Sequence, residues 1–228
     1  MITTLSTAFQ TYRLALYLFV VVAVPVSGLL AAAEPTQRDI QFARVGNRTL
    51  TLDLYAPTEP TTKPAPTIVW IHGGAWRAGS KSDVPVLHWL ERGFAIASVD
   101  YRLTPEAQFP AQAHDIKAAI RCLRGRASEL NLDPDRFVIA GASAGGHLAA
   151  LVGASNGVNE LEGSLGDHVS ESSDVQAIVS FYGASNLQTI LSQSTEHGLG
   201  VRVPALQLLL GGQPDEVIEL AKLASPVA

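Results

Sequence analysis

The sequence predicts an α/β fold, in which a mostly parallel sheet is wrapped by helices and begins with an antiparallel hairpin. Short apolar runs without polar alternation recur along the chain, as is typical of strands buried on both faces. Segments with helical spacing of their apolar residues separate these runs, which favours parallel strands connected by helices. Near the N-terminus, two strand-like segments flank a short turn that contains Gly46 and Asn47, and this pattern indicates the hairpin.

Composition sets limits on the domain organisation and the partners. The 228 residues are 47% hydrophobic and 16% charged, which excludes an intrinsically disordered chain and suits one domain or at most two small ones. The formal net charge is −5 and no basic block occurs, so we expect no nucleic-acid partner. The single cysteine, Cys122, forms neither an internal disulfide nor a cysteine-rich metal site, and we expect no metal site.

The N-terminal segment resembles a targeting sequence. Arg13 precedes an apolar run over residues 14–24, and small residues follow up to Ala33. This order predicts a signal peptide over residues 1–33, hence export to the periplasm or the extracellular space. The alternative is an uncleaved membrane anchor, because residues 14–33 are about long enough to span a bilayer. Contact with a membrane is expected only in that second case. Residues 34–228 then form the folded domain.

The predicted elements follow one another without an internal repeat. The hairpin occupies residues 39–45 and 49–55, and in its second strand the leucines alternate with polar residues, as in a half-buried strand. A loop rich in proline and threonine follows. In the segment 111–124 the apolar residues recur at helical spacing, so one face of this helix packs on the sheet. The expected parallel strands are Thr67–Ile71, Ala95–Val99, Phe137–Ala140 and Val175–Phe181, and the expected helices are Val84–Arg92, Ala111–Arg124, Ala144–Val152 and Asp215–Ala224.

One pentapeptide indicates the chemistry. Gly141-Ala142-Ser143-Ala144-Gly145 follows a buried strand and begins a helix, which is the context that a Gly-x-Ser-x-Gly nucleophile turn requires. The serine must lie in a sharp turn so that its hydroxyl projects above the sheet, and small neighbours such as Gly141 and Gly145 allow that turn. At the start of the helix, the backbone N–H of Ala144 is placed to donate to an oxyanion.

A second glycine-containing loop complements this turn. Strand 67–71 ends in His72-Gly73-Gly74-Ala75-Trp76. Glycines directly after a buried strand let backbone N–H groups approach a ligand closely. This is the position at which an oxyanion hole is completed in folds that carry the serine turn.

Together these segments resemble the α/β-hydrolase fold, a three-layer sandwich, and within it the esterases and lipases related to hormone-sensitive lipase and to bacterial feruloyl and acetyl esterases. The motifs that carry the resemblance are His72–Trp76, Asp100–Glu106 with Phe109-Pro110, and Gly141–Leu148. The resemblance implies a serine carboxylic ester hydrolase that forms an acyl-enzyme on Ser143 without a cofactor. It implies an oxyanion hole from the N–H groups of Gly74, Ala75 and Ala144, and a structural role for His72.

The resemblance also implies that part of the machinery is missing from these residues. In this fold the triad follows the order Ser, Asp or Glu, His, and the last two come after strands that would follow residue 228. We therefore expect an incomplete hydrolase domain whose last strands, catalytic Asp and catalytic His are absent. Asp167 with His197 has the right order, but Asp167 lies in the loop after the nucleophile helix, and His197 lies in a polar segment that is expected over the pocket and not beneath it. His147, on the nucleophile helix, is expected to pack and not to act as the base.

The substrate is left open. Trp76, Tyr101, Tyr182 and the segment 192–204 are candidates for the pocket wall by position. A short-chain ester and an ester derived from a polysaccharide are both compatible with the pattern. The alternatives to an active esterase are an inactive fragment or pseudoenzyme of the same fold that binds without turnover, and a serine peptidase, which is disfavoured because the chain has no room for a gating domain.

Overall fold

The computed structural model describes residues 33–59 and 62–228. The predicted signal peptide at residues 1–33 lies outside the described residues except for Ala33. Among the described residues, no helix combines the length and the apolar character needed to cross a bilayer.

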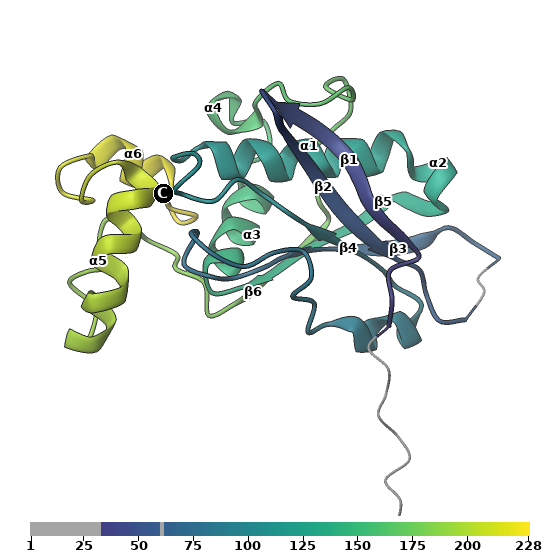
Figure 1. Cartoon of the computed structure of the whole chain (residues 1–228), viewed down its shortest axis with the longest axis horizontal. Helices are drawn as coiled ribbons and strands as arrows, with labels where there is room; N and C mark the ends of the chain where they lie inside the picture. Colours follow the sequence, from purple (N-terminus) through teal and green to yellow (C-terminus); the bar gives the residue numbers. More distant parts are fainter. Residues whose placement is uncertain (1–32, 60–61) are drawn as a thin grey trace, which may run out of the picture. The chain divides into compact units, whose positions relative to one another are not determined.

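The described residues form a six-stranded sheet in the order β1-β2-β4-β3-β5-β6 (Figure 1). Strands β1 and β2 pair antiparallel, and β2 also runs antiparallel to β4, whereas β4, β3, β5 and β6 are mutually parallel. This confirms the predicted hairpin and the mostly parallel sheet. The bounds are β1 Gln37–Val45, β2 Arg48–Tyr55, β3 Ala65–Ile71, β4 Ala95–Val99, β5 Leu132–Ala142 and β6 Ala177–Phe181.

Helices cover the sheet unequally on its two faces. Helices α1 (Ala111–Gly125) and α3 (Ala144–Ala154) pack on one face, where most of the core lies (Figure 1). The short helices α2 (Ala127–Leu130) and α4 (Asn159–Glu162) accompany α1. The opposite face carries a smaller apolar cluster around Trp70, which is covered by the segment that ends in the 3-10 helix η1 (Leu87–Arg92). The sheet and its two coverings are the predicted three layers.

Two predicted helices are shorter in the structure, and three helices were not predicted: the short α2 and α4, and one longer helix. The segment 84–92 is helical only from Leu87, because Pro85 fixes its own φ and disfavours helical geometry at the residue before it. The last predicted helix shortens to α6 (Ile218–Leu223), after a turn in which Gln213 O accepts two backbone N–H groups. Helix α5 (Glu196–Leu210) was expected to be a loop up to Pro204.

The sheet places the loop after β3 and the turn that contains Ser143 at the same end of its parallel strands. Strands β3 and β5 are parallel neighbours, with Ile71 opposite Gly141 in the register. The loop after β3 and the turn after β5 therefore leave the sheet side by side. Strand β6 pairs with β5 on the side away from β3, so the residues that follow Phe181 leave the sheet at this same end.

Candidate active site

Ser143 lies in a strained turn between strand β5 and helix α3. Its backbone has φ 56° and ψ −120°, a combination that costs a residue with a side chain about 1–3 kcal/mol. The Ser143 N–H donates to Phe181 O at 2.9 Å, and Ser143 O accepts the His147 N–H at 2.9 Å. These bonds to β6 and α3 hold the turn on both sides. Within the described residues the Ser143 hydroxyl forms no hydrogen bond.

Glycines permit this turn because backbone passes very close to it. A Cβ on Gly145 would lie 2.0 Å from Ile71 O and 2.4 Å from His72 O, and a Cβ on Gly141 would lie 2.4 Å from Gly145 O. Real Cβ atoms do not approach backbone this closely. The predicted need for glycine at both positions therefore has a specific cause: helix α3 starts directly against the end of strand β3.

The loop after β3 has an unusual run of left-handed residues. Gly74, Ala75 and Trp76 have φ values of 108°, 52° and 59°. Gly74 O accepts the N–H groups of Arg77 and Ala78, and this tight turn leaves only 2.1 Å between a Cβ at position 74 and Ala78 O. In the part of the chain that the structure describes, no acceptor takes the N–H of Gly74, Ala75 or Ala144. Ala75 and Ala144 border the cavity above Ser143; Gly74 does not.

His72 supports this loop from beneath. The ring is buried and stacks on Tyr101, with 4.4 Å between the ring centroids and 12° between the planes. His72 Nδ1 donates to Gly73 O at 2.8 Å, and the Tyr101 hydroxyl donates to His72 O at 3.0 Å. Burial lowers the pKa of His72 and raises that of Tyr101. Both side chains are therefore neutral parts of the frame near neutral pH.

His147 ties the cavity wall to the C-terminal segment. The Trp76 indole N–H donates to His147 Nδ1 at 3.1 Å, and His147 Nε2 donates to Ala224 O at 2.7 Å. An indole N–H only donates and a carbonyl only accepts, so the ring must be the neutral tautomer with its proton on Nε2. Complete burial lowers the pKa of His147 to about 4. Both ring nitrogens are occupied, which leaves neither as a base for Ser143.

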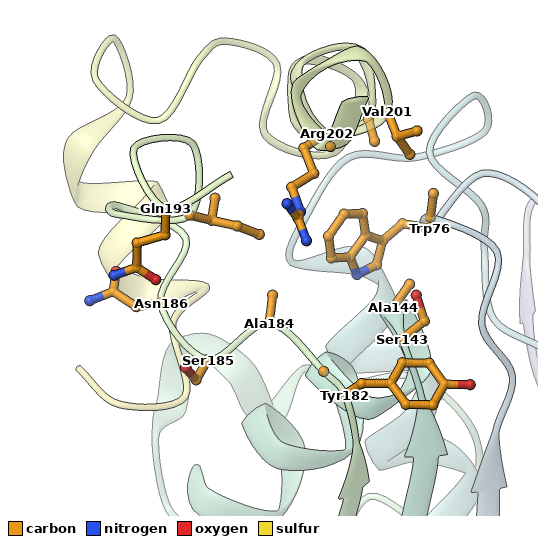
Figure 2. Close-up of a pocket in the computed structure, with 15 residues that line it drawn as sticks. Trp76, Ser143, Ala144, Tyr182, Ala184, Ser185, Asn186, Gln193, Val201 and Arg202 are labelled. Atoms are coloured by element: carbon orange, nitrogen blue, oxygen red, sulfur yellow. The ribbon is translucent and has the colours of Figure 1, made fainter. Parts of the chain in front are cut away.

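The cavity above Ser143 has a volume of about 480 Å³. Ser143, Ala144 and Trp76 border it, with the ring of Tyr182 close to Ser143 (Figure 2). Trp76 and Tyr182 therefore lie where the sequence suggested. The expectation for Tyr101 is corrected. Tyr101 is 1% exposed and does not line the cavity; it is buried against His72, because its hydroxyl donates to His72 O in the loop after β3.

The far wall of the cavity comes from the residues that follow β6 and from the segment 192–204, which was expected at the pocket wall. Residues after β6 contribute Ser185, Asn186 and Gln193, and helix α5 contributes Val201 and Arg202 (Figure 2). The only sequence signal for them was position: they follow a parallel strand at the edge where the serine lies. Arg202 lies in the segment 192–204, but its helix was not predicted, because Gly198, Gly200 and Pro204 all disfavour a helix.

No described residue that lines the cavity is a histidine or an acid. Asp167 and His197 do not line it, so their pairing with Ser143 finds no support. His168 lies against Gly125 at the end of α1, and His114 bonds to Glu160 O. Among the described residues, no group of three or more His, Cys, Asp or Glu side chains is placed to hold a metal ion.

Comparison with known proteins gives consistent results. A family model, BD-FAE, matches residues 52–228. The esterase LipC of Mycobacterium tuberculosis is 34% identical over 58% of this chain and 33% of its own length. The probable carboxylic ester hydrolase LipM of the same organism is 31% identical over 77% of this chain and 40% of its own length. This chain thus spans less than half the length of either relative.

Solved structures show the same likeness. A truncated form of a carbohydrate esterase from gut microbiota superposes with a TM-score of 0.71 at 31% identity. The match covers 86% of this chain and 72% of that one.

Proposed function

Since the chain belongs to the BD-FAE family, an esterase family of the α/β-hydrolase type, we propose that the protein hydrolyses carboxylic esters through an acyl-enzyme on Ser143. The observation that carries the proposal is the strained turn that holds Ser143 at a cavity beside the unengaged N–H groups of Ala75 and Ala144. A hydroxyl that faces such donors is suited to acyl transfer. The proposal requires no cofactor.

The chemistry would proceed in two halves. Ser143 Oγ attacks the ester carbonyl and gives its proton to a base, and the carbonyl oxygen becomes an oxyanion that accepts hydrogen bonds from the N–H groups of Ala75 and Ala144. Collapse expels the alcohol, which takes up the proton, and leaves the acyl group on Ser143. Water then attacks this ester in the same way and releases the acid. Each oxyanion donor of this kind contributes about 100- to 1,000-fold to turnover.

Among the described residues that line the cavity, no His, Asp or Glu is present to act as the base or its acidic partner. We propose that sequence outside these 228 residues supplies both, in the order Asp and then His, as in other α/β-hydrolases. Loss of the histidine of such a triad lowers turnover by about a million-fold. The 228-residue chain is accordingly expected to react slowly.

The substrate class is proposed from the relatives and the cavity. One similar structure is a carbohydrate esterase, which supports an ester derived from a polysaccharide; the esterases LipC and LipM are compatible with a short-chain ester. A volume of about 480 Å³ accommodates an acyl group with part of a sugar ring.

A second candidate is a protein of the same fold that binds an ester without hydrolysing it. The absence of His, Asp and Glu from the described lining residues favours it for the chain by itself. It predicts saturable binding with no release of product.

The two candidates are separated by hydrolysis of 4-nitrophenyl acetate and of acetylated xylo-oligosaccharides. The esterase proposal predicts slow release of product, which Ser143→Ala abolishes and which the exposed control Ser164→Ala leaves unchanged. If Ser143→Ala hydrolyses these esters as fast as the unaltered chain, Ser143 is not the nucleophile. Binding of the oligosaccharide without any acetate release would instead establish the second candidate.

A further inference from the structure

The cavity contains one charged side chain, which the proposed reaction does not use. Among the described residues that line it, Arg202 is the only one with a formal charge. Figure 2 shows Arg202 projecting from helix α5 into the cavity, beside Trp76. The other described lining residues are uncharged, so none of them supplies a carboxylate.

No carboxylate of the described residues forms an ion pair with Arg202. Its Nη1 donates to Ser194 Oγ at 2.8 Å. Arg124, which is buried to a similar degree, also lacks an ion pair, but its donors are taken up by the backbone carbonyls of Pro134, Ser172 and Asp174. Two further arginines are paired with carboxylates. Arg102 forms a forked pair with buried Asp115, with Nη2 to Oδ1 at 2.7 Å and Nε to Oδ2 at 2.9 Å. Arg121 is 3.4 Å from a carboxylate oxygen of Glu162.

A partly buried guanidinium with free donors has a specific preference. It carries five N–H donors in a planar fork, and Ser194 occupies one of its nitrogens. Carboxylates match this fork with two parallel hydrogen bonds, and such charge-assisted bonds are about twice as strong as neutral ones. A carboxylate would also supply the negative charge that the described lining residues lack.

We propose that Arg202 binds a free carboxylate carried by the substrate, so that the protein acts on acidic esters, such as a hemiester or an ester attached to a uronic acid. That the bound molecule is an ester rests on the proposed esterase function. The binding of its carboxylate by Arg202 does not depend on catalysis. Arg202 then selects the substrate, while Ser143 on the other side of the cavity performs the chemistry. A neutral sugar hydroxyl is the competing ligand for the same donors.

The test measures binding to the Ser143→Ala variant of the 228-residue chain, which cannot consume the ligands. Ethyl hydrogen adipate and ethyl hexanoate differ by a carboxylate in place of a methyl group, and calorimetry or ligand-observed NMR at pH 7 gives their dissociation constants. We expect the acidic ester to bind about tenfold more tightly or better, equivalent to about 1.4 kcal/mol. Adding Arg202→Gln should abolish this preference. Arg202→Lys should retain part of it, because the charge remains while the fork is lost.

A matched control removes the same charge elsewhere. Arg44 is an exposed residue of strand β1 outside the cavity, so Arg44→Gln should leave the preference unchanged. Unaltered circular dichroism spectra check the fold of every variant. Equal binding of the two esters, no binding of either, or a preference that survives Arg202→Gln would overturn the proposal. Reaction of Ser143 with a fluorophosphonate in the Arg202→Gln variant reports on the esterase function separately. Failure of one test therefore does not imply failure of the other.

Discussion

At the residue scale, the nucleophile turn depends on the absence of side chains where helix α3 meets strand β3. Gly145→Ala would place a Cβ 2.0 Å from Ile71 O and should lower the free energy of unfolding by about 3 kcal/mol or more, or prevent folding. Gly200→Ala is the matched control, because Gly200 is also helical and its Cβ would meet nothing within 4 Å. That variant should gain up to about 1 kcal/mol. Urea unfolding measures both changes, and equal effects would contradict this account.

A second prediction at this scale concerns the buried histidine. Burial lowers the pKa of His147 to about 4 from an unfolded value of 6.5. As the pH falls from 6.5 to 4, the unfolded chain binds a proton that the folded chain does not. The free energy of unfolding therefore decreases over this pH window, and the contribution of His147 to this decrease is about 3 kcal/mol in total. Above pH 6.5 His147 makes no pH-dependent contribution.

The contribution of His147 is isolated by comparing variants. Urea titrations at pH 7, 6 and 5 should show a smaller loss of stability for His147→Gln than for the unaltered chain. The exposed control His88→Gln should retain the full loss. A pH dependence that is identical in His147→Gln and the unaltered chain would mean that His147 is not the buried neutral group that the structure indicates.

Much of the site could be predicted from a short sequence motif. The roles of Gly141 and Gly145, the place of Ser143 and the packing of His147 follow from a motif whose local geometry is self-contained. Tyr101 was misplaced, because an aromatic ring after a strand can face either a cavity or the loop beside it. Only the hydrogen bond from Tyr101 to His72 O decides between them, and it joins residues 29 positions apart.

At the scale of elements, strand β6 is the part of the sheet that is least covered. Within the described residues it pairs only with β5, and its apolar residues are exposed, with Val179 at 39% and Phe181 at 44%. An exposed apolar strand at an edge is a template for association between chains. We expect the 228-residue chain to associate with rising concentration.

This association should depend on β6 itself. Val179→Lys should shift the chain toward the monomer in light-scattering measurements, because a charge at the edge opposes strand addition. Val169→Lys makes the same substitution at an exposed loop residue and should change nothing. A monomer at all concentrations, or an equal effect of both variants, would argue against this role of β6.

The elements themselves were predicted unevenly. Strand β4 and helix α1 follow from strong local patterns, and their bounds agree with the structure to within one residue. Helix α5 could not be found in the same way, since Gly198, Gly200 and Pro204 all disfavour a helix. It forms because Thr195 caps its start, with Gly198 N 3.2 Å from Thr195 Oγ1, and because Leu206 and Leu209 are buried in the core.

At the scale of the whole molecule, the site is assembled from segments that are distant in sequence. The loop after β3, the turn after β5 and the residues after β6 meet because their strands are parallel neighbours. Residues that follow β6 and residues of α5 then form the far wall. The hydrogen bond from His147 to Ala224 O connects the nucleophile helix to the C-terminal segment. Patterns along the chain predicted the sheet, but the cavity wall depends on contacts that no local pattern contains.

The most direct test of the central claim is the intact mass of the folded 228-residue chain after reaction with a fluorophosphonate, followed by peptide mapping. We predict one phosphonyl group, located on Ser143, formed slowly and absent from Ser143→Ala, with Ser164→Ala labelled like the unaltered chain. Modification at another residue, or a folded chain that never becomes labelled on Ser143, would contradict the assignment of Ser143 as the nucleophile.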